Sequence, residues 1–553
     1  RGTELAAAMV GALAAATALG IGAPGAGGDI RSTVSGHAPV PLLAAAAVAG
    51  FVALGLEVVW MRLAAVALGA TVQTIGLVLA TFLATVAIGA ALGERWPADP
   101  RAAVPWAMGG LAALALLGAA GWGLLPYGVA SLYALGGPAA LGWGTALLAV
   151  TLMGGAPIAS GCAFTLLVRC LGSQRASGLY VANTVGSIAG AWVGGLWAMP
   201  ALEARGSVLL FAGLAAASAA LLARKPWPAI PAVALALVLP GWDAQLFAVG
   251  IHLRISDFSD PSPRAVRQFA DEGWELLTYD HGSTGAVAVG RSIRTGNVWM
   301  SINGKVDAST GDDMPTQRLS GTLPLRAAGG AQDVLVVGLA SGVTAGAVLA
   351  ESGVRALTLI ELEPAVVRAS HHFDHVNGRP LDDPRTTLII DDARAFLQRP
   401  GPQFDVIVSE PSNPWITGVS SLFTLEYWQA VRARLRPGGV VCQWVQLYGL
   451  GPDELRGVLR TFRQVFPDTW LFITVAGSDV LLIGGVPELP ADLPAEPVLT
   501  PEEIRRFAGT GWLNTDDRPR VEWEAPRWLH YATGASNAAL LEGARSRPPV
   551  TPE

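Results

Sequence analysis

Charged residues are scarce in this sequence: they make up 14% of the 553 residues, whereas soluble globular proteins carry about 25%. Hydrophobic residues make up 52%, a composition that disordered chains do not have. The formal net charge of -6 provides no basic surface of the kind that DNA or RNA requires. The composition therefore excludes a disordered chain, and we expect no nucleic-acid partner.

Cysteine is scarce as well, and the three cysteines, Cys162, Cys170 and Cys442, form no CxxC pair. This number excludes a secreted fold held by disulfides and makes a thiolate zinc site unexpected. His371 and His375 have the i, i+4 spacing that can bind a metal, but no third ligand lies nearby in the sequence. We therefore expect these histidines on a solvent-facing helix and predict no metal site.

Charge is distributed unevenly, because residues 1 to about 250 contain very little of it and the remainder contains most. A bilayer is crossed by about 20 apolar residues. Candidate spans lie near 4–24, 41–61, 70–93, 104–126, 139–168, 179–201, 206–223 and 228–241. The last is short enough to be re-entrant or interfacial, and 4–24 has a signal peptide as its alternative. Since the chain starts at Arg1, we expect the natural N-terminus to lie upstream.

Small residues fill these spans, as in GAALG (89–93) and GSIAGAWVGG (186–195), and predict a tightly packed helical bundle. Glu57 is a carboxylate within an apolar segment, which is either functional or paired with Arg62. Trp60 and Arg62 are interpreted as anchors at the membrane interface.

Basic residues between the spans indicate the orientation. If every span crosses, the face that carries more of them should be cytoplasmic; it holds Arg95, Arg101, Arg169, Arg175, Arg224 and Lys225. The C-terminal part then lies outside if 228–241 crosses, and inside if it does not.

The hydrophobic pattern of the C-terminal part is typical of an α/β enzyme. Short alternating runs between about 276 and 306 predict a small antiparallel sheet. From about 331, strands alternate with helices, which predicts a parallel sheet. The predicted strands are 333–338, 357–362, 386–391, 404–410 and 437–445, with a closing strand near 481–485.

The turn after the first of these strands, VVGLASGVTAG (336–346), is rich in glycine and begins a helix whose N-terminus favours anionic or polar groups. Glu361 ends the next strand, where an acid accepts hydrogen bonds from ribose hydroxyls. Asp391 and Asp392 follow the third strand. Together these features predict a nucleoside site, with a plain α/β domain as the alternative.

The expected architecture is a multi-pass α-helical membrane bundle fused to an α/β Rossmann-like domain with a small preceding β-sheet. The bundle is expected over 1–250, the small β domain with a gate segment over 251–330, and the Rossmann-like domain over 331–485. A C-terminal linker, the NTDDRP segment and a tail follow over 486–553.

The C-terminal region resembles the spermidine synthase (polyamine aminopropyltransferase) family, a variant of the S-adenosylmethionine methyltransferase fold. The resemblance is carried by VLVVGLASG (334–342), LIELEP (359–364), DPRTTLIIDDARAFL (383–397), FDVIVSEPSNP (404–414) and LRPGGVVCQW (435–444). The apolar half, with EVVWMRL (57–63) and YVANTVGSIAGA (180–191), is similar to bacterial membrane proteins that fuse a transporter-like bundle to such a domain.

The resemblance implies that Glu361 binds the ribose, that Asp392 and Ala393 contact the adenine, and that Gly338 and Gly342 line the donor's tail. Ser341 stands where the family has an aspartate that binds the donor's amine.

On the acceptor side, Glu410 replaces the family's catalytic aspartate and is the candidate catalytic residue, since a carboxylate there can accept the nucleophile's proton. Asn413 replaces a second aspartate. In the gate triplet Thr316-Gln317-Arg318 only Gln317 matches, and Arg318 would place a positive charge where a cation should bind. The remaining candidate substrate-binding residues are Asp307, Trp415, Gln446 and Tyr448; Asp312, Asp313 and Trp444 are further pocket candidates.

The predicted function is a membrane-anchored transferase whose donor is S-adenosylmethionine or its decarboxylated form and whose acceptor is an amine or an amphipathic molecule. The expected partners are these small molecules and the lipid bilayer, with a homo-oligomer left open. We expect a multi-pass protein of the bacterial inner membrane with a cytoplasmic C-terminal domain. The alternatives are a non-catalytic nucleoside-binding domain that regulates a transporter-like bundle, and a methyltransferase.

Overall fold

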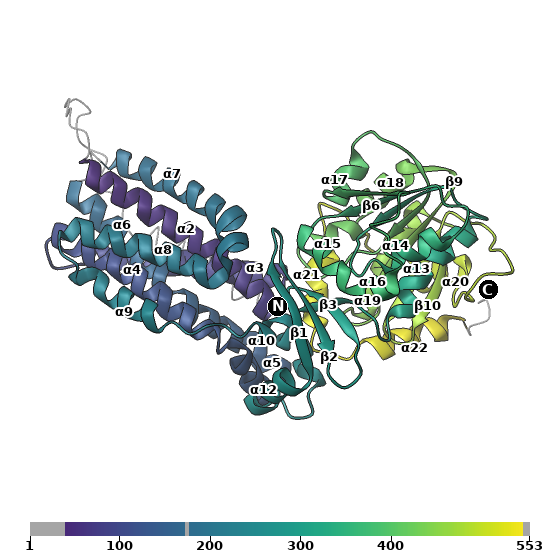
Figure 1. Cartoon of the computed structure of the whole chain (residues 1–553), viewed down its shortest axis with the longest axis horizontal. Helices are drawn as coiled ribbons and strands as arrows, with labels where there is room; N and C mark the ends of the chain where they lie inside the picture. The colour runs from purple at the N-terminus through teal and green to yellow at the C-terminus, as the bar shows by residue number, and fades with distance from the viewer. Residues whose placement is uncertain (1–38, 172–175, 546–553) are drawn as a thin grey trace. The chain divides into compact units, whose positions relative to one another are not determined.

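The computed structural model describes residues 39–171 and 176–545, and the expected span 4–24 lies outside them. The chain divides into two compact units (Figure 1). We call the first, with Gln73–Phe247 as its main part, the helical unit. The second, with Arg267–Glu553 as its main part and with the short segments Gly69–Val72 and Ala248–Ser259, we call the α/β unit.

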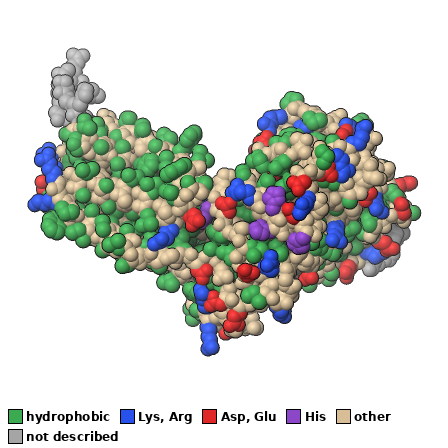
Figure 2. All heavy atoms as spheres, viewed as in Figure 1, with side chains coloured by type: hydrophobic (Ala, Val, Ile, Leu, Met, Phe, Trp, Pro, Cys, Tyr) green, Lys and Arg blue, Asp and Glu red, His purple; other side chains and the backbone are tan. Residues whose placement is uncertain are grey.

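The helical unit consists of long apolar helices because its residues are mostly Ala, Leu, Val and Gly. Its helices are α2 (Val40–Leu68), α3 (Val72–Glu94), α4 (Pro100–Trp122), α5 (Leu125–Met153), α6 (Gly155–Leu171), α7 (Ser177–Val193), α8 (Met199–Ala223) and α9 (Ile230–Val238). Five apolar stretches of the described residues are long enough to cross a membrane, and the fifth is the run Ser177–Ala223 through α7 and α8. Hydrophobic side chains cover most of the visible surface of this unit (Figure 2).

Glycines allow α2 and α7 to pack closely. A Cβ on Gly186 would lie 2.0 Å from the carbonyl oxygen of Ala47, and one on Gly190 would lie 2.0 Å from that of Phe51. The segment GSIAGAWVGG therefore packs as the sequence predicts, with small residues where two helix backbones meet.

One expectation in this unit needs correction. Trp60 is 1% exposed and stacks on Trp122 with ring centroids 5.7 Å apart, so the interpretation of Trp60 as an interface anchor is wrong. Arg62 donates a hydrogen bond to the carbonyl oxygen of Gly195 at 3.2 Å. Tryptophan is found both in protein interiors and at membrane interfaces, because its large apolar ring is stabilised in either environment.

The α/β unit begins with an antiparallel sheet of four strands in the order β1-β2-β3-β4. The strands are β1 (Trp274–His281), β2 (Ala286–Ser292), β3 (Val298–Ile302) and β4 (Lys305–Ser309). A two-residue turn of Asn303 and Gly304, both at positive φ, joins β3 to β4. This turn directs β4 and its polar residues Lys305 and Asp307 back along the sheet.

A mixed sheet of seven strands follows, in the order β10-β11-β9-β8-β5-β6-β7. The strands are β5 (Asp333–Val337), β6 (Ala356–Glu361), β7 (Thr386–Ile390), β8 (Phe404–Ser409), β9 (Leu435–Gln446), β10 (Trp470–Val475) and β11 (Asp479–Gly484). β9, β8, β5, β6 and β7 are parallel, while β11 pairs antiparallel to β9 and β10 to β11. This is the expected Rossmann-like fold, although the sequence did not predict β10.

Helices cover both faces of this sheet (Figure 1). Before and among the strands lie α10 (Ala244–Ala248), α11 (Ile251–Arg254), α12 (Pro263–Glu272), α13 (Met314–Ala327), α14 (Val343–Ala350), α15 (Pro364–Ser370), α16 (Asp374–Asn377), α17 (Ala393–Gln398), α18 (Leu425–Arg434) and α19 (Pro452–Val465). The last helices are α20 (Pro501–Ala508), α21 (Arg520–Glu524) and α22 (Gly534–Arg545).

The strand order has one point that matters for function. The chain runs from β5 outward to β6 and β7 on one side, and then returns to β8 on the other side of β5. The carboxyl ends of β5 and β8 therefore form the topological switch point, where open α/β sheets bind their ligands.

Candidate active site

The glycine turn after β5 contacts the end of β8. Gly338 has a φ of 93°, and a Cβ at this position would lie 2.8 Å from the carbonyl oxygen of Glu410. The N–H of Glu410 in turn donates to the carbonyl oxygen of Val337 at 3.1 Å. Only glycine permits both the positive φ and this close approach, so Gly338 brings the glycine turn against the candidate catalytic residue.

Gly342 ends the same turn at a φ of 81° and is the N-cap residue of α14. A Cβ there would lie 3.1 Å from Nδ2 of Asn377. The amide of Asn377 also donates to the carbonyl oxygen of Ser341 at 2.8 Å. The side chain of the buried Asn377 therefore holds the glycine turn in place through this hydrogen bond.

Glu361 ends β6, as predicted, and its carboxylate binds the backbone of two segments. Oε2 accepts a hydrogen bond from the N–H of Leu339 at 3.0 Å, and Oε1 accepts one from the N–H of Glu363 at 2.9 Å. Burial raises the pKa of Glu361, while these backbone N–H groups lower it. Glu361 thus holds the glycine turn against β6, and each of its oxygens keeps a lone pair for a ribose hydroxyl.

Asp392 and Ala393 follow β7, at the same edge of the sheet. The N–H of Asp391 donates to the carbonyl oxygen of Glu361 at 3.1 Å, which joins the two strand ends. Asp392 is exposed and caps α17 by accepting from the N–H of Ala395 at 2.6 Å, while Ala393 is buried. The predicted nucleoside residues are therefore brought to one edge, with Asp392 on its outer side.

Ser341 and Gln317 contact each other through their side chains. The hydroxyl of Ser341 donates to Oε1 of Gln317, and Nε2 of Gln317 donates to the carbonyl oxygen of Ser309 at 2.8 Å. Both residues are buried, at 1% and 5% exposed. Ser341 of the glycine turn is thus bonded to Gln317 of α13.

Glu410 lies between this turn and α14. Its Oε2 accepts a hydrogen bond from the hydroxyl of Thr344 at 2.5 Å. Its pKa is raised to about 8, chiefly by burial and further by the nearby Asp479 and Asp313, although the hydroxyls of Thr344 and Ser320 oppose the rise. A carboxyl group that titrates near neutral pH at a switch point is suited to proton transfer.

The half-buried Asp313 and the buried Asp479 belong to the same cluster of acids. Asp313 precedes α13 and accepts hydrogen bonds from the N–H of Ser309 at 2.8 Å and from Gln317 at 3.0 Å. Asp479 begins β11 and accepts from the hydroxyl of Thr316 at 2.9 Å. Burial raises the pKa of both carboxyl groups. Such acids repel one another when ionised, so a cationic ligand beside them would be stabilised.

Lys305 and Asp307 form a buried ion pair on β4. Nζ of Lys305 lies 2.8 Å from Oδ1 of Asp307, and the two side chains are 10% and 8% exposed. Burial alone would lower the pKa of Lys305, but Asp307, Tyr448 and Asp479 outweigh it and the pKa is raised. A permanently charged ammonium group thus lies beside the cluster of acids.

The remaining predicted substrate-binding residues surround this ion pair. Ser412 donates a hydrogen bond to Oδ1 of Asp307, which brings the loop after β8 and its Asn413 to β4. Gln446 lies opposite Asp479 on the neighbouring strand. Tyr448 is half-buried and close enough to Lys305 for the ammonium to lower its pKa, although burial raises it overall.

Several polar atoms here are buried without a hydrogen-bond partner. They are both amide atoms of Asn413, both amide atoms of Gln446, Nε1 of Trp415 and Oδ2 of Asp307. Buried polar groups are normally satisfied, because leaving one unpaired costs about 1–3 kcal/mol. Their concentration at one place is what a site for a polar ligand requires.

Two expected pocket residues lie on the surface instead. Asp312 and Arg318 are both exposed, and the described residues include no ion-pair partner for Arg318. The expectation that Arg318 puts its charge into the acceptor site is therefore wrong. The physical reason is the helical period of α13, which buries Gln317 and turns the next residue outward.

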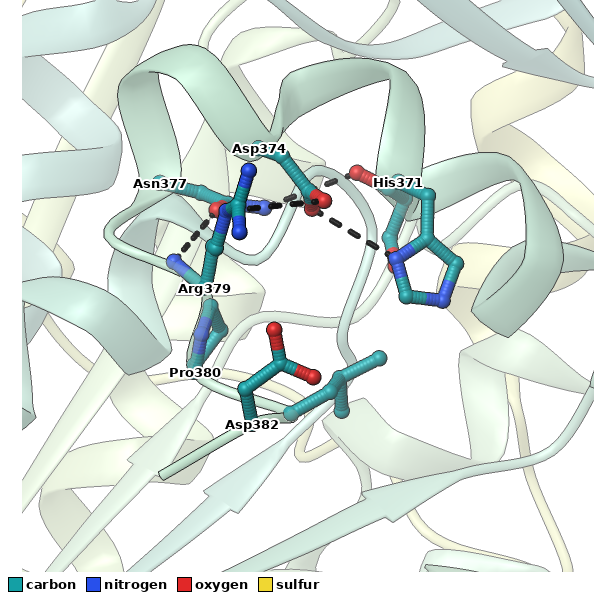
Figure 3. A pocket seen from close by; sticks show the side chains of 8 residues that line it. His371, Asp374, Asn377, Arg379, Pro380 and Asp382 are labelled. Carbon is teal, nitrogen blue, oxygen red and sulfur yellow. Dashed lines mark hydrogen bonds and ion pairs between the residues drawn. The ribbon is translucent and has the colours of Figure 1, made fainter.

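The two histidines with i, i+4 spacing lie on the surface. His371 belongs to a short 3-10 helix and His375 to α16, and both are exposed. Figure 3 shows His371 beside Asp374, with Nδ1 3.5 Å from Oδ1, at the edge of a shallow depression. The described residues contain no group of three or more His, Cys, Asp or Glu residues that could hold a metal.

Three residues of the site were missed in the sequence: Thr344, Asp479 and Lys305. Asp479 is a charged residue directly before the apolar segment VLLIGG, and a charged residue in such a place indicates a functional acid. Lys305 is one of only two lysines among the 37 basic residues, and this rarity marks it as well. Thr344 carried no signal, because a threonine in the first turn of a helix is common.

Part of the chain is similar in sequence to known proteins. Residues 315–478 match the family model described as the spermine/spermidine synthase domain. The chain is 28% identical over 200 residues to a spermidine synthase of Dictyostelium discoideum. That match covers 36% of this chain and 70% of the relative. It is 31% identical over 196 residues to a polyamine aminopropyltransferase of Klebsiella pneumoniae (strain 342), covering 35% of this chain and 64% of the relative.

Among solved structures, the chain is similar to a spermidine synthase of Thermotoga maritima, at 19% identity and a TM-score of 0.35. That similarity covers 48% of this chain and 88% of the other. The resemblance expected from the sequence is confirmed, and the curated relatives indicate a transferase. The K. pneumoniae relative is matched over less than two thirds of its own length.

Proposed function

We propose that the α/β unit is an aminopropyltransferase of the spermidine synthase type, which takes its group from an S-adenosyl sulfonium donor and transfers it to an amine. The family match over 315–478 supports the reaction class. The glycine turn, Glu361 and Asp392 support the nucleoside part of the donor, since they come together at the strand ends, where open α/β sheets bind their ligands.

One observation carries the proposal: Glu410 is a buried acid with a pKa of about 8, at the switch point and in contact with the glycine turn. An amine attacks a carbon only when its nitrogen has a free lone pair. A carboxylate whose pKa lies near the working pH accepts the amine's proton more readily than one with an ordinary pKa. Asp313 and Asp479 would stabilise the cationic acceptor before it reacts.

The transfer of the group from sulfur to nitrogen needs no cofactor. The lone pair of the acceptor nitrogen attacks the methylene carbon next to the sulfonium and forms a C–N bond. The C–S bond breaks, and its electron pair stays on sulfur, which leaves a neutral thioether, methylthioadenosine. The nitrogen gives up one proton, which Glu410 accepts.

The helical unit is proposed to anchor this enzyme in the bacterial inner membrane, with the α/β unit in the cytoplasm. Five apolar stretches support several membrane crossings. α9 has nine residues, about half of the roughly 20 that a crossing needs, which favours a re-entrant or interfacial segment and a cytoplasmic α/β unit. Protease digestion of inverted and right-side-out membrane vesicles tests the orientation: α/β-unit fragments released only from inverted vesicles would agree with it.

Product analysis tests the reaction. The full chain in detergent is incubated with each S-adenosyl donor and a panel of amines, and products are identified by mass spectrometry. Methylthioadenosine supports the proposal when the amine has gained an aminopropyl group from the decarboxylated donor or a 3-amino-3-carboxypropyl group from S-adenosylmethionine. S-adenosylhomocysteine with a methylated product supports a methyltransferase.

Glu410→Gln provides the matched test, with the exposed Glu488→Gln as its control. We expect Glu410→Gln to lose product formation and to keep donor binding. Donor binding with no product from the wild-type chain under any condition would support a non-catalytic nucleoside-binding domain instead.

A further inference from the structure

Lys305 is a buried ammonium group that is only partly satisfied. The residue is 8% exposed, and its bond to Asp307 is the one hydrogen bond found for Nζ among the described residues. An ammonium group carries three N–H donors. Two of them therefore point to no oxygen of the surrounding protein, although burying a charge without full hydrogen bonding is costly.

Asp307, in turn, has one carboxylate oxygen without a hydrogen-bond partner. Oδ1 is occupied by Lys305 and Ser412, whereas Oδ2 is buried and has no partner. The ion pair thus offers free positive donors on one side and a free negative acceptor on the other. A ligand that carries an anionic and a cationic group close together would satisfy both with charge-assisted hydrogen bonds.

The surroundings of the pair fit such a ligand. The ring of Trp444 lies under Nζ of Lys305, with its centroid 5.5 Å away. Gln446 projects from the same face of β9 as Trp444, because side chains alternate along a strand, and both of its amide atoms are unpartnered. The unpartnered amide of Asn413 follows Ser412, which binds Asp307. These amides add neutral donors and acceptors around the charged pair.

The same geometry disfavours a simple diamine. An ammonium group that bound Asp307 would share this carboxylate with Lys305. The ammonium group of a diamine at this end would lie close to Nζ with no carboxylate beside it to offset the repulsion, and like charges repel strongly in a buried place. The selection against a dication therefore comes from Lys305, and not from the exposed Arg318.

We infer that Lys305 and Asp307 bind the α-amino-carboxylate end of one of the two substrates, with the carboxylate on Lys305 and the ammonium group on Asp307. The inference rests on the proposed transferase function and narrows its substrate class. Two sources carry such an end: the donor, if it is S-adenosylmethionine that has kept its carboxylate, or an acceptor that is an α-amino acid with a second amine.

Two pairs of compounds test the inference, because the members of each pair differ by one carboxylate. S-adenosylmethionine is compared with its decarboxylated form, and ornithine with putrescine in the presence of methylthioadenosine. Binding to the full chain in detergent is measured by isothermal titration calorimetry. We expect the carboxylated member of one pair to bind at least about tenfold more tightly, and the pair that shows this identifies the source.

Lys305→Met should remove that preference, while Lys225→Met, which changes the other lysine, should leave it unchanged. Because Lys305→Met leaves Asp307 buried and unpaired, the double variant Lys305→Met/Asp307→Asn serves as a second test with both charges removed. A preference that survives in both variants would overturn the inference. Equal or weaker binding of the carboxylated compound in both wild-type pairs would overturn it as well.

Methylthioadenosine separates this failure from failure of the proposed function. This nucleoside carries neither an amino acid end nor an aliphatic amine, so its binding reports only on the proposed nucleoside residues at the strand ends. If it binds and the carboxylates make no difference, only the role of Lys305 and Asp307 is overturned. If neither it nor either donor binds, the transferase proposal is overturned together with the inference.

Discussion

The hydroxyl of Thr344 lies 2.5 Å from Oε2 of Glu410, so the first turn of the helix after the glycine turn holds the carboxyl group at the end of β8. This hydroxyl lowers the pKa of Glu410, which is raised to about 8. Thr344→Val should therefore raise this pKa further. Since the base acts in its deprotonated form, we expect the rising limb of kcat/KM against pH to move up by about one pH unit, which is about tenfold less activity near pH 7.5.

The control for this prediction is Thr344→Ser, which keeps the hydroxyl and should keep the pH profile. A Thr344→Val enzyme whose profile is unshifted would mean that Glu410 is not the group whose ionisation limits the rate.

Glu410 also predicts a pH-dependent stability. Its pKa is about 8 when folded and about 4.5 when unfolded, so between these pH values the folded state binds more protons than the unfolded state. Stability contributed by this group is thus present below about pH 4.5 and lost as the pH rises through 8. Asp313 and Asp479, whose pKa values are also raised, act in the same direction.

Glu410→Gln removes this contribution. We expect its melting temperature to exceed that of the wild type by an amount that grows from pH 5 to pH 9, measured by differential scanning fluorimetry. A difference that is constant over this range would contradict the raised pKa of Glu410. Glu488→Gln should follow the wild type at every pH, because Glu488 is exposed.

Glu361 and Glu363 allow the nucleoside role to be separated from a structural one. Glu361 binds the N–H of Leu339 in the glycine turn, whereas Glu363 binds the N–H of Thr284 at 2.6 Å and that of Ala365 at 3.1 Å. Replacing either buried carboxylate by alanine should lower the melting temperature, since backbone donors lose their partner. Only Glu361→Ala should also weaken methylthioadenosine binding, by about tenfold or more, in calorimetric titrations.

Equal weakening by Glu363→Ala would show that the loss comes from general loosening of this edge of the sheet.

The fold of the α/β unit was predictable because its signals are local. Apolar runs such as DVLVV and FDVIVS lie between turn residues, and glycine and acid positions mark where the strands end. β10 was missed although Gly477, Ser478 and Asp479 closely follow WLFITV, so a turn signal of the kind that joins two antiparallel strands was present in the sequence. The site was predictable as far as strand ends identify it, which covers Gly338, Glu361 and Glu410.

The acceptor side was less predictable, because it is assembled from segments far apart in the sequence. Lys305 and Asp479 meet only because β4 and β11 are brought together by folding, and no local pattern encodes that proximity. Arg318 was assigned to the pocket from its place in a triplet, but the neighbours of a residue on a helix face are set three and four positions away. Trp60 shows the same limit in the helical unit, where its sequence context could not distinguish burial from an interface.

Replacing Gln446 should affect stability and substrate binding in opposite directions. Its side-chain amide is fully buried and neither atom has a partner. Gln446→Leu removes that unpaired group, so we expect a melting temperature equal to or a few degrees above that of the wild type. The same change should weaken binding of the substrate that occupies the Lys305 side, seen as a raised KM with little change in kcat. A destabilised Gln446→Leu would mean that the amide has partners in the folded protein.

Gly190 tests the packing of the helical unit. A Cβ at this position would lie 2.0 Å from the carbonyl oxygen of Phe51, so any side chain forces α2 and α7 apart. Gly213 lies on α8, and a Cβ there would meet nothing within 4 Å. We expect Gly190→Val to lower the melting temperature of the detergent-solubilised chain, or to produce aggregation in size-exclusion chromatography, while Gly213→Val behaves as the wild type.

The effect of Gly190→Val should be largest in the helical unit, because helices in an apolar environment associate through close packing and gain little from the hydrophobic effect. Methylthioadenosine binding by the α/β unit, measured on the same sample, should be retained by any fraction that stays monodisperse. If Gly190→Val and Gly213→Val were equally stable, α2 and α7 would not be packed with their backbones in contact, and the small residues of GSIAG would need another explanation.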